Sequence, residues 1–181
     1  MLFINPVVSA ILLTFSGPGF EVPLINIIAL IPLFYSLNRY KDRWLSLTLT
    51  FGLIYYFINL FWITDAVNFF GDTNIFVGML LTLLLAAYLS FYYVIFGYIF
   101  IKTDSKITIA TTFAILELIK SFFMTGFPWL NLGLTFIGYK PILINAALIG
   151  EIGLSFIVIL FNLIILDFLK SWRKGVILFL I

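Results

Sequence analysis

The chain has 181 residues, of which 64% are apolar and 10% are charged, and its net charge is +2. An ordinary soluble domain is roughly half apolar and a quarter charged, so this composition and a mean hydropathy of +1.21 exclude a water-soluble globule and predict an integral membrane protein. The sequence contains no cysteine and no histidine, which excludes thiol nucleophiles, disulfides and Cys/His metal sites within it. We therefore expect no metal and no cofactor, and the small net charge argues against nucleic acid as a partner.

Apolar runs predict an all-α integral membrane fold, because a crossing takes about 20 residues and the chain has room for roughly six or seven. The expected spans are residues 2–15, 22–37, 45–62, 75–101, 107–124 and 142–169. The first is short for a bilayer, and Pro32 predicts a kink in the second. Residues 65–72, whose only charges are acidic, are expected to form a turn.

The last seven residues, 175–181, are apolar and follow a basic stretch. Seven helical residues cover only about 10 Å of a hydrocarbon layer about 30 Å thick. We interpret them as the start of a seventh span that is cut short, following a six-helix transmembrane domain over residues 1–174. The alternative is a tail lying at the membrane interface.

Basic residues predict the orientation in the membrane. When the spans alternate, eight of the ten Lys and Arg residues fall on one side: Arg39, Lys41, Arg43, Lys102, Lys106, Lys170, Arg173 and Lys174. Only Lys140 lies in a loop on the other side. The positive-inside rule then puts the N-terminus in the cytoplasm and the link around Trp129 outside.

Two opposite charges, Glu117 and Lys120, lie three residues apart on one face of the fifth span. An unpaired charge there would cost roughly 2.5–3.5 kcal/mol, so we expect the two to neutralise each other. One interpretation is an ion pair that holds the bundle together. The other is a role in positioning an anionic or polar ligand near the outer half of the membrane.

The sixth span contains two further polar residues, Glu151 and Asn162. Gly150 and Gly153 flank Glu151, and small residues at such a place let another helix approach. Glu151 could then accept hydrogen bonds from a neighbour, or serve as a packing acid. We expect Asn162 to form hydrogen bonds across helices.

The link over residues 126–133 differs from the spans around it. Pro128 forces Phe127 out of the helical region, and two glycines bracket Trp129 and Asn131. We predict a non-helical or re-entrant stretch, which membranes tolerate only where it is buried in protein or lines a wet cavity. It is the best candidate for a ligand-facing surface on the outer side, and the alternative for Trp129 is an anchor in the aromatic belt.

Several motifs then carry a family resemblance across essentially the whole chain. In order they are TFSGPGF (14–20), LFWI (60–63), LTLLLAAY (81–88), the stretch from Glu117 that ends in TGFPWLNLG (125–133), and GLSF through Asn162. Together they resemble the membrane region of bacterial apolipoprotein N-acyltransferase. The most specific piece is the run TGFPWL.

The resemblance implies a multi-pass protein of the bacterial cytoplasmic (inner) membrane that takes part in lipoprotein biosynthesis. The family transfers a fatty acyl chain from a phospholipid donor to the N-terminal diacylglyceryl-cysteine of a lipoprotein acceptor. It has eight membrane helices, and a nitrilase-like domain inserted between the seventh and eighth carries a Glu-Lys-Cys triad. The implied partners are phospholipid, lipoprotein, membrane lipids and a separate or downstream nitrilase-like domain.

The sequence departs from the family because it has no cysteine, so no catalytic residue is assigned and the chain alone is expected to be inactive. Lys120 stands where the family often has Arg. A lysine cannot bind a carboxylate or phosphate in the bidentate geometry of a guanidinium. Whether the chain is itself an enzyme is left open, and the alternative is a non-enzymatic membrane scaffold or small transporter. The candidate substrate- or lipid-binding residues are Trp62, Glu117, Lys120, Phe127, Pro128, Trp129 and Asn131.

Overall fold

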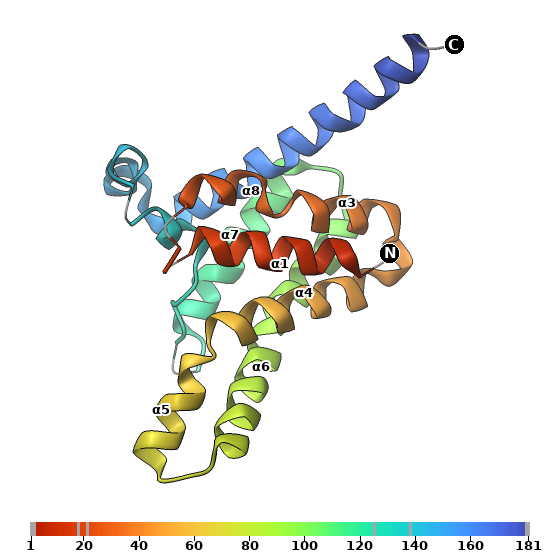
Figure 1. Ribbon diagram of the computed structural model, residues 1–181. Helices are drawn as coiled ribbons and strands as arrows, with labels where there is room; N and C mark the ends of the chain where they lie inside the picture. The colour runs from red at the N-terminus through yellow and green to blue at the C-terminus, as the bar shows by residue number, and fades with distance from the viewer. Residues whose placement is uncertain (1–2, 18, 21, 125, 138, 180–181) are drawn as a thin grey trace.

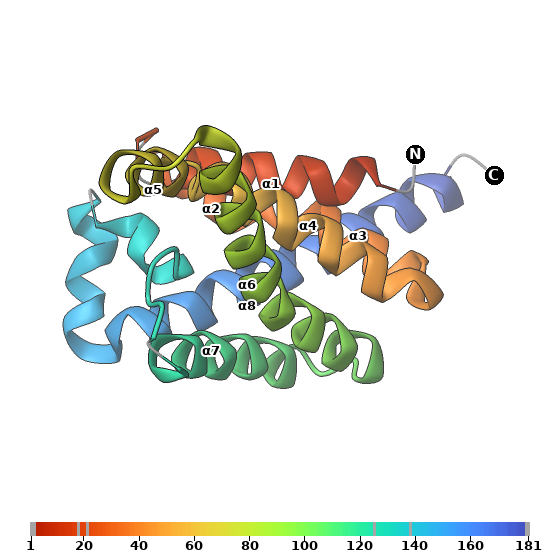
Figure 2. The same ribbon diagram turned by 90° about the horizontal axis from the view of Figure 1, so that it is seen from below.

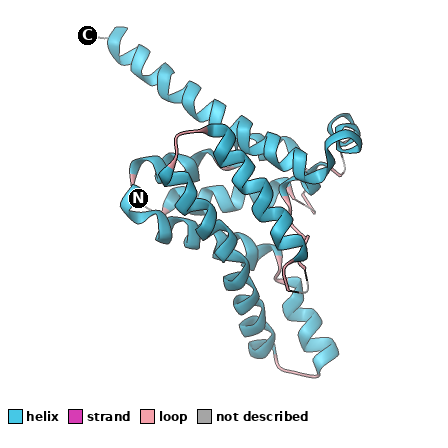
Figure 3. Ribbon diagram, turned by 180° about the vertical axis from the view of Figure 1, so that it is seen from behind, coloured by secondary structure: helices cyan, strands magenta, loops and turns pink. Residues whose placement is uncertain are grey.

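The computed structural model describes residues 3–17, 19–20, 22–124, 126–137 and 139–179, and all regular structure in these residues is helical, as predicted (Figures 1 and 3). The α-helices are α1 (Ile4–Ser16), α2 (Asn26–Ala29), α3 (Ile31–Arg39), α4 (Trp44–Asn59), α5 (Trp62–Gly71), α6 (Ile75–Lys102), α7 (Lys106–Phe122) and α8 (Lys140–Phe179). Short 3-10 helices are η1 (Pro23–Ile25), η2 (Lys41–Arg43) and η3 (Leu132–Phe136).

Two helical stretches are long and apolar enough to cross a membrane, namely α6 and the part of α8 over Ala146–Trp172. A third candidate is the pair Lys41–Asn59 and Trp62–Gly71, which is bent by 54° at the break between its two parts. The stretches Ile4–Ser16 and Pro23–Arg39 are shorter apolar helices. By length and composition the described residues support two or three crossings, and the six-span bundle stays a prediction.

The expected turn at residues 65–72 is wrong, because most of it belongs to helix α5. Asp65 lies in the first turn of α5, where the helix dipole favours a negative charge. The helix ends at Gly71, and Asp72 follows in a left-handed conformation with φ 46°. The acidic charges therefore mark a helix start and a helix end, and the α5–α6 hairpin projects from the body of the molecule (Figure 3).

The predicted kink in the second apolar run is confirmed, because the helix is interrupted at Leu30, just before Pro32. The side chain of Asn162 from α8 fills this interruption. Its Oδ1 accepts the N–H of Leu30 at 2.9 Å, and its Nδ2 donates to the carbonyl of Asn26 at 2.9 Å. These two groups would bond to each other in a continuous helix, so the amide replaces the missing bond. The predicted hydrogen bonding of Asn162 across helices is confirmed.

Helix α8 is bent at Gly150, which has a left-handed φ of 70°. A Cβ at Gly150 would meet nothing, and one at Gly153 would meet Ile149 of the same helix. The expectation that these two glycines admit another helix is therefore wrong. Residues 175–179 belong to α8, and residues 180–181 lie outside the described part of the chain. That residues 175–181 begin a seventh span stays a prediction.

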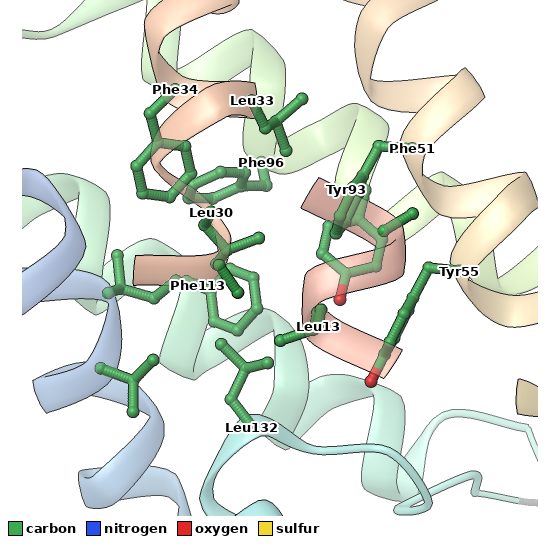
Figure 4. Close-up of a cluster of buried hydrophobic side chains, with 14 of the residues drawn as sticks. Leu13, Leu30, Leu33, Phe34, Phe51, Tyr55, Tyr93, Phe96, Phe113 and Leu132 are labelled. Carbon is green, nitrogen blue, oxygen red and sulfur yellow. The ribbon is translucent and has the colours of Figure 1, made fainter. Parts of the chain in front are cut away.

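The core is a cluster of buried rings and leucines contributed by most of the helices (Figure 4). Close packing of α4 on α6 depends on small residues, since a Cβ at Gly52 would meet Ser90 and one at Gly97 would meet Thr48. The rings of Phe51, from α4, and Tyr93, from α6, meet edge to face at 4.7 Å.

The loops divide between two ends of the molecule (Figure 2). The start of α1, the loops over residues 40–43 and 103–105, and the end of α8 lie at one end, which we call the basic end. Helix α5 and the link between α7 and α8 lie at the other, which we call the aromatic end. An ion pair between Lys106 and Asp167 joins the start of α7 to α8 at the basic end.

Candidate functional site

The link after α7 follows an irregular path, as the sequence predicted. Residues 126–131 are not helical, and η3 follows them. Gly126 and Leu130 adopt left-handed conformations, with φ of 73° and 63°. Irregular backbone leaves N–H and C=O groups without helical partners, and burying such groups unpaired is costly. The site is organised around the side chains that bind these groups.

Two buried charged side chains of α7 hold this backbone. The Oε1 atom of Glu117 accepts the N–H of Leu132 at 2.8 Å, and the Nζ of Lys120 donates to the carbonyl of Trp129 at 3.2 Å. Glu117 is 5% exposed and Lys120 2%. The Lys120 ammonium also lies 3.5 Å from the hydroxyl of Tyr56. One face of α7 thus grips the link at two points, and we call Glu117 and Lys120 the α7 clamp.

The expected ion pair between Glu117 and Lys120 is not formed, although the structure describes both residues. Each side chain binds the backbone of the link instead, because that backbone offers an unpaired N–H to the carboxylate and an unpaired C=O to the ammonium. The second carboxylate oxygen of Glu117, Oε2, is buried without a hydrogen-bond partner. The two charges still share one buried face of α7.

Hydrogen bonds from α8 hold the opposite side of the link. The Nδ2 of Asn131 donates to Glu151 Oε1 at 3.0 Å, as expected of Glu151, and lies 3.3 Å from Ser121 Oγ. The N–H of Gly133 donates to Ser155 Oγ at 2.8 Å. A Cβ at Gly133 would collide with the backbone carbonyl of Glu151, so the close approach predicted beside Glu151 occurs at Gly133.

Asn26, which the sequence reasoning missed, also binds the link. Its Nδ2 donates to the carbonyl of Leu132 at 3.1 Å and to Thr135 Oγ1 at 2.8 Å. Ser155 was missed as well. The available signal was a polar residue in an otherwise apolar run, but composition alone does not say which distant backbone such a residue meets.

Three aromatic rings lie together at the surface beside the clamped link, and we call them the aromatic platform. Trp129 stacks on Trp62 from α5 with ring centroids 5.3 Å apart and an angle of 22°, and Phe127 lies 6.2 Å from Trp129. The exposed fractions are 54% for Trp129 and 47% for Trp62. The platform therefore presents rigid apolar surface to whatever surrounds the aromatic end.

A hollow of about 450 Å³ opens beside the platform. Its walls are Pro128, Trp129, Leu130, Leu134 and Ile137, with the carboxyl-bearing Glu151 at one side. This volume lies within the range of small-molecule sites, about 300–1,000 Å³. Its mostly apolar walls suit a hydrocarbon chain, and Glu151 suits a hydrogen-bond donor or a cation. Within the described residues no cluster of three metal-binding side chains occurs.

The structure gathers the predicted site residues in one place. Those at the surface are Trp62, Phe127, Pro128 and Trp129, and those that hold the link from below are Glu117, Lys120 and Asn131. Their role in binding lipid or substrate stays a prediction. The geometry divides them into surface residues, which a ligand can touch, and buried residues, which hold the surface residues in position.

Comparison with known proteins shows which family this chain belongs to. Residues 9–164 match the family profile described as the apolipoprotein N-acyltransferase N-terminal domain. The apolipoprotein N-acyltransferase of Haemophilus ducreyi is 32% identical over 126 residues, which cover 68% of this chain and 25% of that protein. The proteins of the same name from Haemophilus influenzae and Geobacter metallireducens are 27% and 29% identical over 95% and 94% of this chain. The chain spans 33% and 34% of the length of these two relatives.

Proposed function

Because this chain belongs to the apolipoprotein N-acyltransferase family, we propose that it forms the membrane-embedded part of an enzyme that moves a fatty acyl chain from phospholipid to the N-terminal diacylglyceryl-cysteine of a lipoprotein. In this proposal the 181 residues supply lipid access and a docking surface. The partners are a phospholipid donor, a lipoprotein acceptor and a nitrilase-like domain.

The proposed topology has six crossings in the bacterial inner membrane, with the basic end in the cytoplasm. The grouping of the loops over residues 40–43 and 103–105 with the end of α8 supports this orientation (Figure 2). Helices α1 and α3 are short for a span, so the proposal needs thinned lipid or burial of their ends among neighbouring helices. The aromatic end then faces the periplasm.

The hollow beside Trp129 is the observation that carries the functional proposal. Its apolar walls come from an irregular link that side chains of α7 and α8 hold at several backbone atoms. A site held in this way keeps its shape without a ligand, which lowers the entropic cost of binding. We propose that an acyl chain of the phospholipid or of the lipoprotein lies in this hollow against Trp129.

The reaction needs residues beyond those in this chain. The resemblance implies a cysteine thiolate as the acyl carrier, and the 181 residues contain no cysteine. We propose that the nitrilase-like domain supplies it and that the chain alone is inactive. An acyl-transfer assay of the purified chain, with phospholipid donor and diacylated lipopeptide acceptor, should give no turnover, and turnover would refute this part.

Photo-crosslinking tests the hollow directly. The chain would be placed in phosphatidylethanolamine vesicles that contain a phospholipid with a photoreactive group on its acyl chain, and the adducts would be mapped by mass spectrometry. We expect adducts concentrated at residues 128–137, and the substitution Leu134→Trp should reduce them by filling the hollow. The matched control is Leu80→Trp, on an exposed part of α6. Adducts spread evenly over exposed apolar residues would contradict the proposal.

The absence of cysteine makes the topology easy to test, because any introduced cysteine is a unique label. In whole bacterial cells, a membrane-impermeant maleimide should label Trp129→Cys and should reach Lys41→Cys only after the membrane is opened. The reverse pattern would contradict the orientation. Labelling of one position from both sides in turn would favour the small-transporter alternative.

A further inference from the structure

A second hollow, of about 330 Å³, lies at the basic end between α1, α3 and α8. Ile31 and Pro32 of α3 and Leu166 and Leu169 of α8 form its apolar walls. Asn5 of α1, Tyr35 of α3 and Lys170 of α8 supply the polar part of the lining. The hollow thus combines a hydrocarbon surface with a cation, whereas the hollow at the aromatic end combines one with a carboxyl group.

The cation at this hollow is available to a ligand. Asp167 forms its closer ion pair with Lys106, while Lys170 lies 3.8 Å from the other carboxylate oxygen. Pairs as exposed as this one hold each other weakly. A second cation stands nearby, because the guanidinium of Arg39 donates to the hydroxyl of Tyr35 at 3.1 Å. Lys170 therefore lines the hollow from α8, and Arg39 of α3 lies behind the lining residue Tyr35, to which it is hydrogen-bonded.

We propose that this groove binds an anionic phospholipid of the leaflet at the basic end. One acyl chain lies along the apolar walls, and the phosphate lies at Lys170 and at the Arg39–Tyr35 pair. The apolar walls favour a lipid over a soluble anion, and the two cations favour a net negative headgroup over a zwitterionic one. The site shares no lining residue with the hollow beside Trp129. The link that forms the hollow beside Trp129 lies at the other end of the molecule (Figure 2).

Spin-labelled lipids test this proposal. The full chain would be reconstituted in phosphatidylcholine vesicles with a trace of spin-labelled phosphatidylglycerol or of spin-labelled phosphatidylcholine, and electron paramagnetic resonance would give the fraction of label held at the protein. We expect the protein to hold phosphatidylglycerol several-fold more strongly. The double variant Arg39→Gln/Lys170→Gln should bring the two lipids close to equality.

Three further variants separate this groove from a general attraction to the basic end. Leu169→Trp fills the groove without changing its charge and should reduce the held fraction of phosphatidylglycerol. Lys41→Gln/Lys102→Gln removes two charges at the same end that belong neither to the lining nor to the Arg39–Tyr35 pair, and Lys140→Gln removes one at the other end. Both should keep at least most of the preference for phosphatidylglycerol.

Three results would overturn the proposal. The first is no preference for phosphatidylglycerol in the unaltered chain. The second is an equal loss of preference in Lys41→Gln/Lys102→Gln and in Arg39→Gln/Lys170→Gln, which would indicate only the field of the basic end. The third is full displacement of the lipid by glycerol phosphate at equal concentration, which would show that the acyl chain contributes nothing. None of these results bears on acyl transfer, so the proposed function is tested separately.

Discussion

The packing of α4 on α6 differs from the packing of the 126–136 link between α7 and α8 in what holds the two partners together. Between α4 and α6 both partners are regular helices whose backbone groups are already paired, and contact is made by small residues and rings such as Gly97 against Thr48. Around the link the backbone is irregular, and buried polar side chains bind it at Trp129, Leu132 and Gly133.

The difference shows where buried polar residues are needed in an apolar protein. A regular helix can meet another through dispersion and shape alone, so its interface tolerates adjustment of one side chain by another. An irregular segment at depth must have each N–H and C=O satisfied by something else. A stability loss caused by a substitution between α4 and α6 should therefore be recoverable by a second substitution. A loss caused by a substitution at the link should not be.

The largest effect is expected for Gly133→Ala. The new Cβ would collide with the backbone carbonyl of Glu151, which no side-chain movement can relieve. We expect a loss of about 3 kcal/mol in the free energy of unfolding, at the upper end for overpacking. Denaturant unfolding in detergent measures it. The control Gly71→Ala places a Cβ no closer than 3.5 Å to its neighbours, and a similar loss there would contradict the prediction.

Removing one charge of the α7 clamp should cost about 2–3 kcal/mol, because a hydrogen bond between a charged group and the buried backbone of the link is lost while the other charge stays buried. Glu117→Gln and Lys120→Met would be compared with the double variant Glu117→Gln/Lys120→Met by thermal unfolding. We expect the double variant to lose less stability than the sum of the single losses. The control is Asp167→Asn/Lys170→Gln, an exposed pair at the same spacing, where the coupling should be below about 0.5 kcal/mol. Simple additivity at Glu117 and Lys120 would show that their charges do not interact.

Asn162→Leu should cost about 2 kcal/mol, because it leaves the N–H of Leu30 and the carbonyl of Asn26 without their partner. Hydrogen exchange gives a local measurement, since the amide of Leu30 should exchange faster while amides in α6 do not change. Asn38→Leu is the control, because Asn38 bonds only to a carbonyl of its own helix. Unchanged exchange at Leu30 would mean that the helix closes across the break without Asn162.

The smallest effect is expected between α4 and α6. Gly97→Ala would place its Cβ against the methyl group of Thr48 and should cost about 1–2 kcal/mol. Thr48→Ser removes that methyl and keeps the hydroxyl that donates to Trp44, so the double variant should regain most of the loss. Thermal unfolding of both variants measures this recovery. If Thr48→Ser does not restore stability, the expected difference between the side-chain contact at Gly97 and the backbone contact at Gly133 is contradicted.

Much of the secondary structure could be predicted from hydrophobic runs. A helix in an apolar chain pairs its own backbone N–H and C=O groups, so it can be predicted from the local sequence without knowing what it packs against. The expected span over residues 75–101 matches α6, and Pro32 and Pro128 marked two places where helices end or break. Helix α5 was missed because its acidic residues resemble those of a turn. Asp65 lies at the start of α5 and Asp72 just after its end, and such positions depend on helix dipole and cap geometry, which composition does not report.

Hydrophobic runs and charge spacing were enough to predict that this protein is helical and apolar, that its basic residues gather at one end, and that residues 126–133 leave the helical path. Packing in three dimensions was needed to show that Glu117 and Lys120 bind the link instead of each other, that Asn162 replaces a helix bond between Asn26 and Leu30, and that Gly133 touches Glu151. Periodicity and charge are properties of the local chain. The partner of a buried polar group is decided by which distant backbone atoms packing leaves unpaired.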